Sequence, residues 1–202
     1  DRMLSKMKAK PWPVYKVKLG TKDDLGIMEQ LTAHTDAKFR VDANAGWTLE
    51  EARILIPELS KMGIELIEQP LAKDNREGMK VLMQSATIPL IADESCVKET
   101  DVPHMPSRFH GINIKLTKCG GITPARRMIT QARQVGLKIL LGTMNETTVG
   151  SAALAHLAPM VDYLDMDGPL LLREDVATGL SYEYGKVSVT DKPGLGIELI
   201  DF

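Results

Sequence analysis

Five charged residues recur along this chain at nearly constant intervals: Lys18, Asp42, Glu68, Asp93 and Lys115. The intervals are 24, 26, 25 and 22 residues, and each interval suits one strand followed by one helix. Each charge also follows a short apolar run, where a strand is expected to end. Parallel strands closed into a barrel gather their carboxyl ends at one mouth. Three carboxylates between two lysines then predict a divalent metal site flanked by two bases.

The three acids differ from ordinary surface charges in what precedes them. A charge at a strand end is usually a solvated loop residue. Here each acid directly follows apolar residues, in VDAN, IEQP and IADES. A carboxylate that leaves a buried strand needs a cation to offset its desolvation. Mg²⁺ prefers oxygen ligands in octahedral geometry, and we therefore expect Mg²⁺ as the cofactor.

Composition supports a globular enzyme. The chain has 202 residues, of which 44% are hydrophobic and 26% charged, with a formal net charge of −2. This balance argues against nucleic acid or a membrane surface as a partner. No apolar run approaches the roughly 20 residues of a transmembrane helix. The first residues, DRMLSKMKAK, lack the apolar segment of a signal peptide, so a cytoplasmic location is expected. Cys96 and Cys119 are expected to be reduced thiols.

Strands and helices are expected to alternate along the chain. Thr48 and Glu51 form a capping box that opens a helix, and Pro57 inside that helix should kink or weaken it. Thr123 and Pro124 are expected to cap and open a later helix. The predicted helices cover residues 23–34, 48–63, 76–86, 123–136 and 147–157.

The alternation predicts an α/β fold, a (β/α) TIM-like barrel. Seven strands are expected, whereas a closed barrel of this type needs eight. We therefore expect a barrel without its first strand, covering residues 1–180. Residues 181–202 are expected to form a C-terminal β segment, with one alternating strand over 182–190 and a turn at 191–194.

Five motifs in this order resemble the barrel domain of the enolase superfamily, within its muconate-lactonizing-enzyme-like subgroup. They are YKVKLG, VDANAGW, IEQP, ADES and NIKLTKCGG, and the resemblance runs from about Val14 to Pro169. In DMDGP, Asp165 and Asp167 resemble the Asp-x-Asp motif of dipeptide epimerases of the L-Ala-D/L-Glu type. The resemblance implies an isomerase whose barrel is accompanied by an N-terminal capping domain that this chain does not include.

The resemblance also implies a chemistry for the spaced charges. Asp42, Glu68 and Asp93 would hold Mg²⁺, which stabilises the enediolate formed when an α-proton next to a carboxylate is removed. Lys18 would act on the S-configured substrate and Lys115 on the R-configured one, so that two-base proton transfer inverts the α-carbon. Lys16 lies on the same strand face as Lys18 and would add a like charge beside it.

Other residues are candidates for supporting roles. Lys118 competes with Lys115, although strand alternation favours Lys115. Asp165 and Asp167 either capture the ammonium of a dipeptide or serve as loop caps. Thr143 and Met144 are expected to line the substrate pocket.

Two further functions stay open at this stage. A different superfamily reaction, o-succinylbenzoate synthesis or N-acyl amino acid racemisation, would begin from the same enolate. The second alternative is an inactive barrel fragment that needs a partner segment, because seven strands leave two unpaired edges. A small-molecule dipeptide is the expected partner, and homo-oligomerisation is left open.

Overall fold

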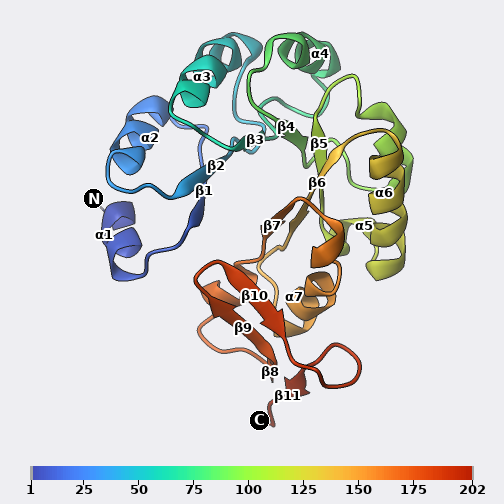
Figure 1. Cartoon of the computed structure of the whole chain (residues 1–202). Coiled ribbons are helices and arrows are strands. Elements are labelled where there is room, and N and C mark those ends of the chain that lie inside the picture. Colours follow the sequence, from blue (N-terminus) through green and yellow to red (C-terminus); the bar gives the residue numbers. More distant parts are fainter. Residues whose placement is uncertain (1, 202) are drawn as a thin grey trace. The chain divides into compact units, whose positions relative to one another are not determined.

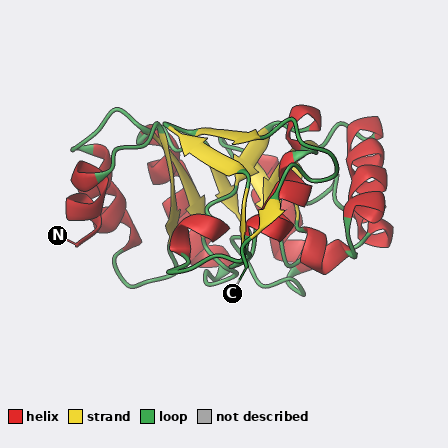
Figure 2. Ribbon diagram, turned by 90° about the horizontal axis from the view of Figure 1, so that it is seen from below, coloured by secondary structure: helices red, strands yellow, loops and turns green. Residues whose placement is uncertain are grey.

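The computed structural model describes residues 2–201. These residues divide into two compact units, of which unit 1 comprises residues 2–95 and 104–111 and unit 2 comprises residues 96–103 and 112–201. Seven strands of the largest sheet follow one another in chain order. Loops, drawn green in Figure 2, join the strands (yellow) to the helices (red).

Unit 1 repeats a strand followed by a helix. Its strands pair in parallel, with Lys18 beside Asp42 and Asp42 beside Glu68. The two short strands at 66–68 and 90–92 are entirely buried, as expected for parallel strands covered on both faces. The elements are α1 (Arg2–Ala9), β1 (Val14–Lys18), α2 (Asp24–Thr32), β2 (Lys38–Asp42), α3 (Leu49–Lys61), β3 (Leu66–Glu68), α4 (Arg76–Ser85) and β4 (Leu90–Ala92). Figure 1 shows α2, α3 and α4 side by side along one side of these strands.

Helix α3 begins as the sequence predicts. The Thr48 side chain accepts a hydrogen bond from the Glu51 backbone, and the Glu51 side chain accepts one from the Thr48 backbone. The helix continues through Pro57, which is exposed. Proline lacks the N–H that would bond to the carbonyl of Arg53, and Arg53 is exposed as well, so water can satisfy that carbonyl. Ala52, Ile56 and Leu59 form the buried face of the helix.

Unit 2 continues the alternation of strands and helices. The chain passes through η1 (Glu99–His104) and β5 (Gly111–Ile114) where the units meet in sequence. The remaining elements up to residue 171 are α5 (Leu116–Cys119), α6 (Ile122–Gln134), β6 (Lys138–Gly142), α7 (Thr148–Ala155), η2 (Ala158–Met160), β7 (Tyr163–Asp165) and η3 (Gly168–Leu171). Strands β6 and β7 pair in parallel, with Gly142 beside Asp165.

The start of α6 differs from the prediction. We expected Thr123 as the cap, whereas the helix begins at Ile122 and its N-cap is Gly121. Gly121 has a φ of 112°, a conformation that is strained for residues with a side chain. The Gly120-Gly121 pair therefore turns the chain earlier than the capping pattern indicates.

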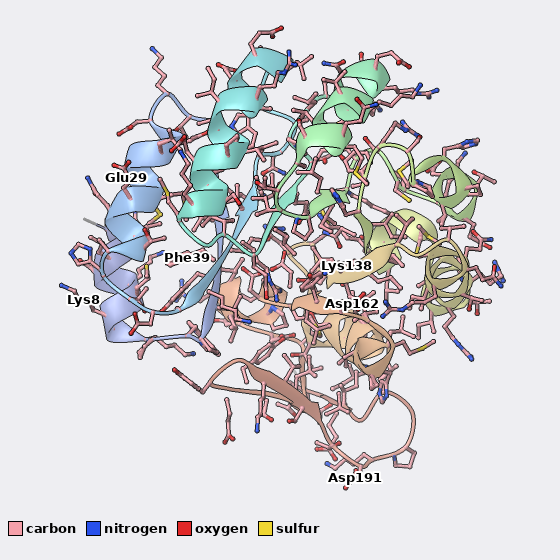
Figure 3. All side chains as sticks on the ribbon, turned by 45° about the horizontal axis from the view of Figure 1, so that its top comes forward. Lys8, Glu29, Phe39, Lys138, Asp162 and Asp191 are labelled. Atoms are coloured by element: carbon pink, nitrogen blue, oxygen red, sulfur yellow. The ribbon has the colours of Figure 1, made fainter. Side chains whose placement is uncertain are left out.

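The amino ends of β6 and β7 are joined by charged residues. The carboxylate of Asp162 accepts hydrogen bonds from the backbone of Ile139 at 2.8 Å and from the Arg133 guanidinium at 2.7 Å. Figure 3 shows Lys138 and Asp162 near one another at these strand starts. The hydrogen bonds of Asp162 thus have a structural role. They lie at the amino ends of the strands, whereas the regularly spaced charged residues lie at the carboxyl ends.

The C-terminal residues form paired strands. These are β8 (Ala177–Thr178), β9 (Leu180–Glu183), β10 (Lys186–Val189) and β11 (Glu198–Leu199). The prediction of a single strand over 182–190 was wrong, because β9 and β10 form an antiparallel hairpin. Tyr184 and Gly185 have φ values of 38° and 80°, and two successive positive φ values suit a tight hairpin turn. The division of the chain at residue 180 stays a prediction.

None of the helices in the described part of the chain is long and apolar enough to cross a membrane. Within the described residues, neither Cys96 nor Cys119 forms a disulfide.

Candidate functional site

The carboxyl ends of β2, β3 and β4 bring the predicted acids together in unit 1. Asp42 and Glu68 end neighbouring strands in register, and Asp93 directly follows β4. Their exposed fractions are 1%, 0% and 1%. The ammonium of Lys16 lies 3.1 Å from an Asp42 oxygen and 2.8 Å from a Glu68 oxygen. The buried negative charge of this cluster is therefore balanced in part by one lysine.

Glu68 is the acid that its surroundings disturb most. Burial raises the pKa of Glu68 from an ordinary 4.5 to about 7. The charge of Lys16 opposes this rise, whereas the nearby carboxylates of Asp42 and Asp93 add to it. Both carboxylates act on Glu68, so the acids are close enough to interact strongly. The charge of Lys16 therefore does not offset the whole rise in the pKa of Glu68.

Lys18 lies at the end of β1 beside this cluster. Its ammonium donates a hydrogen bond of 2.8 Å to the Asn44 side chain and contacts an Asp42 oxygen at 3.4 Å. Its side chain is 71% exposed, in contrast to the 16% of Lys16. Asn44 has a positive φ of 44°, and its backbone N–H bonds to Asp42. Strand alternation thus places both lysines on the face of the acids, and only Lys18 is open to solvent.

The donor set fits a hard divalent cation such as Mg²⁺. All three candidate ligands offer carboxylate oxygens, which Mg²⁺ prefers, and their burial makes uncompensated charge costly. Within residues 2–201, no group of three Asp, Glu, His or Cys side chains is arranged to hold a metal ion as it stands. The Lys16 ammonium contacts two of the carboxylates instead. Ligation by all three would require their side chains to turn from this arrangement.

In unit 2, Lys115 follows β5 and is 8% exposed. It caps the short helix α5, and Lys118 lies inside that helix rather than on the strand. A Cβ atom at Gly142 would lie 2.7 Å from the Asn113 amide and 3.1 Å from Cε of Lys115. Asn113 and Lys115 are two residues apart and both lie over β6, so they share a strand face. The glycine leaves the space that the lysine side chain occupies.

The residues after β6 and β7 are tied to one another. Thr143 is 8% exposed, and its backbone N–H bonds to the Asp165 carbonyl at 2.9 Å. Its hydroxyl accepts a hydrogen bond from Gly168 at 3.3 Å. Met144 is 47% exposed, and its N–H bonds to the Glu146 side chain at 2.9 Å. Thr143 therefore has a structural role at these strand ends, while Met144 is open to solvent.

The two acids of the Asp-x-Asp motif have different settings. Asp165 ends β7 and is partly buried, whereas Asp167 is exposed and precedes η3 with a φ of −85°. The buried side chain of Met166 separates them. An exposed acid beside a partly buried one at a strand end is suited to a cationic group, and the pair's role stays a prediction.

Sequence reasoning missed three polar residues of these strand ends. Gln69, Asn44 and Asn113 each lie within two residues of a predicted site residue. Gln69 and Asn113 are buried, at 0% and 1% exposure. The sequence offered one signal for them: an uncharged polar residue next to a predicted site residue in IEQP, VDAN and NIK. Packing alone does not require a polar side chain at these positions, because an apolar or turn residue would pack equally well.

Comparison with known proteins places the chain in one family. Residues 2–201 match the family described as enolase C-terminal domain-like. The chain is 51% identical over 200 residues to an L-Ala-D/L-amino acid epimerase of Flavobacterium johnsoniae, covering 99% of this chain and 60% of that protein. It is 37% identical over 185 residues to an L-Ala-D/L-Glu epimerase of Bacteroides thetaiotaomicron, covering 91% of this chain and 48% of that one.

Solved structures agree with these sequence matches. A dipeptide epimerase from Methylococcus capsulatus, solved in complex with Mg, superposes with a TM-score of 0.93 at 32% identity. The match covers 98% of this chain and 62% of that one. The same enzyme has been solved with Mg and the dipeptide L-Arg-D-Lys. The predicted (β/α) barrel fold and the predicted superfamily are thereby confirmed, and the chain belongs to the enolase C-terminal domain-like family.

Proposed function

We propose that this chain carries the catalytic residues of a Mg²⁺-dependent dipeptide epimerase that inverts the α-carbon of the C-terminal residue. The observation that carries the proposal is the cluster of buried carboxylates with Lys18 at its edge. Three buried carboxylates at neighbouring strand ends favour a bound cation, and a solvent-open lysine beside them is placed to move a proton. The 51% identity to an L-Ala-D/L-amino acid epimerase supports this proposal.

Asp42, Glu68 and Asp93 would hold the Mg²⁺. When bound, it would supply positive charge to the substrate carboxylate as the α-proton leaves. Lys16, which contacts Asp42 and Glu68 in the structure, would keep a second positive charge on the same strand face as Lys18.

Lys18 and Lys115 would exchange the α-proton from opposite faces of the carbon. One lysine removes the proton and the other returns a proton, so the configuration inverts. Asn44 accepts a hydrogen bond from the Lys18 ammonium and orients it, and the glycine at 142 gives Lys115 its space.

Asp165 and Asp167 would bind the free ammonium of the dipeptide. The relative with the higher identity acts on L-Ala-D/L-amino acids and the one at 37% on L-Ala-D/L-Glu, so we propose a substrate range wider than glutamate at the second position. A substrate without a free ammonium gains nothing from this acid pair. The chain spans about 60% of the length of the Flavobacterium johnsoniae relative, so residues outside it would share in choosing the side chain.

The proposal is tested by proton NMR in D₂O with Mg²⁺ and a panel of L-Ala dipeptides and N-acyl amino acids. Loss of the dipeptide α-proton signal together with new diastereomer peaks is the expected result. Reaction of N-acyl amino acids alone would instead favour a racemase and remove the role of the Asp-x-Asp pair. No exchange with any compound contradicts the proposal.

Three lysine variants assign the two bases. Lys18→Ala and Lys115→Ala should each abolish epimerisation and each retain deuterium exchange with one enantiomer only. Lys118→Ala is the matched control, because it removes a lysine three residues from Lys115, and it should epimerise normally. Equal exchange of both enantiomers in either of the first two variants would contradict the two-base mechanism.

A further inference from the structure

Gln69 is a buried polar residue that the proposed chemistry does not use. It directly follows Glu68 and has no exposed surface. Its φ is 37°, in the left-handed region that residues with a side chain rarely adopt. Such a conformation persists only where the surroundings hold it in place. The structure shows what holds Gln69.

The Gln69 side chain uses both ends of its amide. Its oxygen accepts hydrogen bonds from the backbone N–H of Asp93 at 3.0 Å and of Ser95 at 3.1 Å. Its nitrogen donates to the Leu71 carbonyl at 2.8 Å and to the Ser95 hydroxyl at 2.9 Å. A primary amide has two donors and two acceptor sites, so the side chain is fully satisfied.

The Gln69 backbone adds two contacts of the same kind. Its N–H donates to the Ile91 carbonyl on β4 at 2.9 Å, and its carbonyl accepts from Ala45 at 2.8 Å. Ala45 lies three residues after Asp42. One residue is therefore bonded to the segments that carry Asp42 and Asp93 and is covalently joined to Glu68.

We infer that Gln69 is a positioning residue that sets the spacing of the three acids and thereby the affinity of this site for Mg²⁺. The inference rests on the proposed metal site. The hydrogen bond to the Asp93 amide fixes the point where that acid leaves β4. Groups that orient metal ligands without touching the metal commonly change affinity by about 10- to 100-fold when they are removed.

The deciding variant is Gln69→Met, which keeps the length and burial of the side chain and removes all four side-chain hydrogen bonds. Ser95→Ala is a milder variant that removes one partner of the Gln69 nitrogen. Thr48→Ala is the matched control, because it removes an exposed helix cap in the same unit whose side chain bonds only to Glu51. The control should lower stability without touching the acids.

Two measurements separate a positioning role from a purely structural one. Isothermal titration of the metal-free protein with Mg²⁺ gives the affinity, and amide hydrogen exchange reports the Asp93 and Ser95 N–H groups directly. Gln69→Met should weaken Mg²⁺ binding by about 10- to 100-fold and speed exchange at both amides. Ser95→Ala should weaken Mg²⁺ binding about threefold, as expected for one lost hydrogen bond. Thr48→Ala should leave affinity and both amides unchanged.

Mg²⁺ affinity within threefold of the parent in Gln69→Met would overturn the inference, even if the variant is less stable. If Gln69→Met does not fold, parent-like affinity in Ser95→Ala overturns it. Failure of the parent protein itself to bind Mg²⁺ would overturn the metal site of the proposed function together with this inference. The parent titration therefore distinguishes the two failures.

Discussion

Replacing Glu68 with glutamine tests the electrostatics of the acid cluster without any substrate. In the metal-free protein, burial raises the pKa of Glu68 from 4.5 to about 7. The folded state then holds a proton more tightly than the unfolded state does. The stability that this proton provides is fully present below pH 4.5 and is lost as the pH rises through about 7. The shift corresponds to about 3 kcal/mol of unfolding free energy.

The Glu68→Gln variant carries no such charge at any pH. The difference in unfolding free energy between variant and parent should therefore move in favour of the variant by about 3 kcal/mol between pH 4 and pH 8. Titrating groups that do not interact with Glu68 are common to both proteins and cancel in the difference. Any constant effect of the changed contact with Lys16 cancels in the comparison across pH.

The assay is urea unfolding of both proteins in EDTA at several pH values, followed at pH 8 by the same experiment with Mg²⁺. Mg²⁺ should raise the stability of the parent at pH 8 and have less effect on the variant, which lacks one ligand. A pH-independent difference between the two proteins would refute the buried-acid argument. Glu77→Gln is the control, because Glu77 is an exposed glutamate on α4 and its replacement should not change how stability depends on pH. The same pH-dependent change in Glu77→Gln would also refute the buried-acid argument.

Three further predictions follow from contacts within single units. Gly142→Ala should displace Lys115, since the new Cβ would lie 3.1 Å from Cε, and should cut Lys115-dependent deuterium exchange at least tenfold while Lys18-dependent exchange persists. Trp47→Phe should lower the unfolding free energy by about 1–3 kcal/mol in urea titrations, because the buried Asp24 carboxylate loses its 2.7 Å bond from the indole. Removal of Mg²⁺ by EDTA should lower the midpoint of thermal unfolding, as measured by calorimetry. At a free Mg²⁺ concentration 100 times the dissociation constant, the bound metal should add about 2.7 kcal/mol to the unfolding free energy.

The periodic features of this protein were accessible from the sequence. The spacing of the charges predicted one strand and one helix per repeat, and the helix at 49–61 begins at the predicted capping box. The burial of Asp42, Glu68 and Asp93 also agrees with the apolar runs that precede them. These features depend on residues near in sequence, because strand alternation and helix capping are local.

The tertiary structure decided which distant groups meet. Lys16 lies between two acids because β1, β2 and β3 pair in register, and the sequence alone does not predict that register. Gln69 bonds to residues 24 and 26 positions further along the chain, which no local pattern indicates. The hairpin turn at Tyr184 was missed because tyrosine seldom adopts a positive φ. Spacing along the chain thus predicted which residues could do chemistry, whereas strand register and buried hydrogen bonds decided how they are held, because those contacts exist only once distant segments are packed.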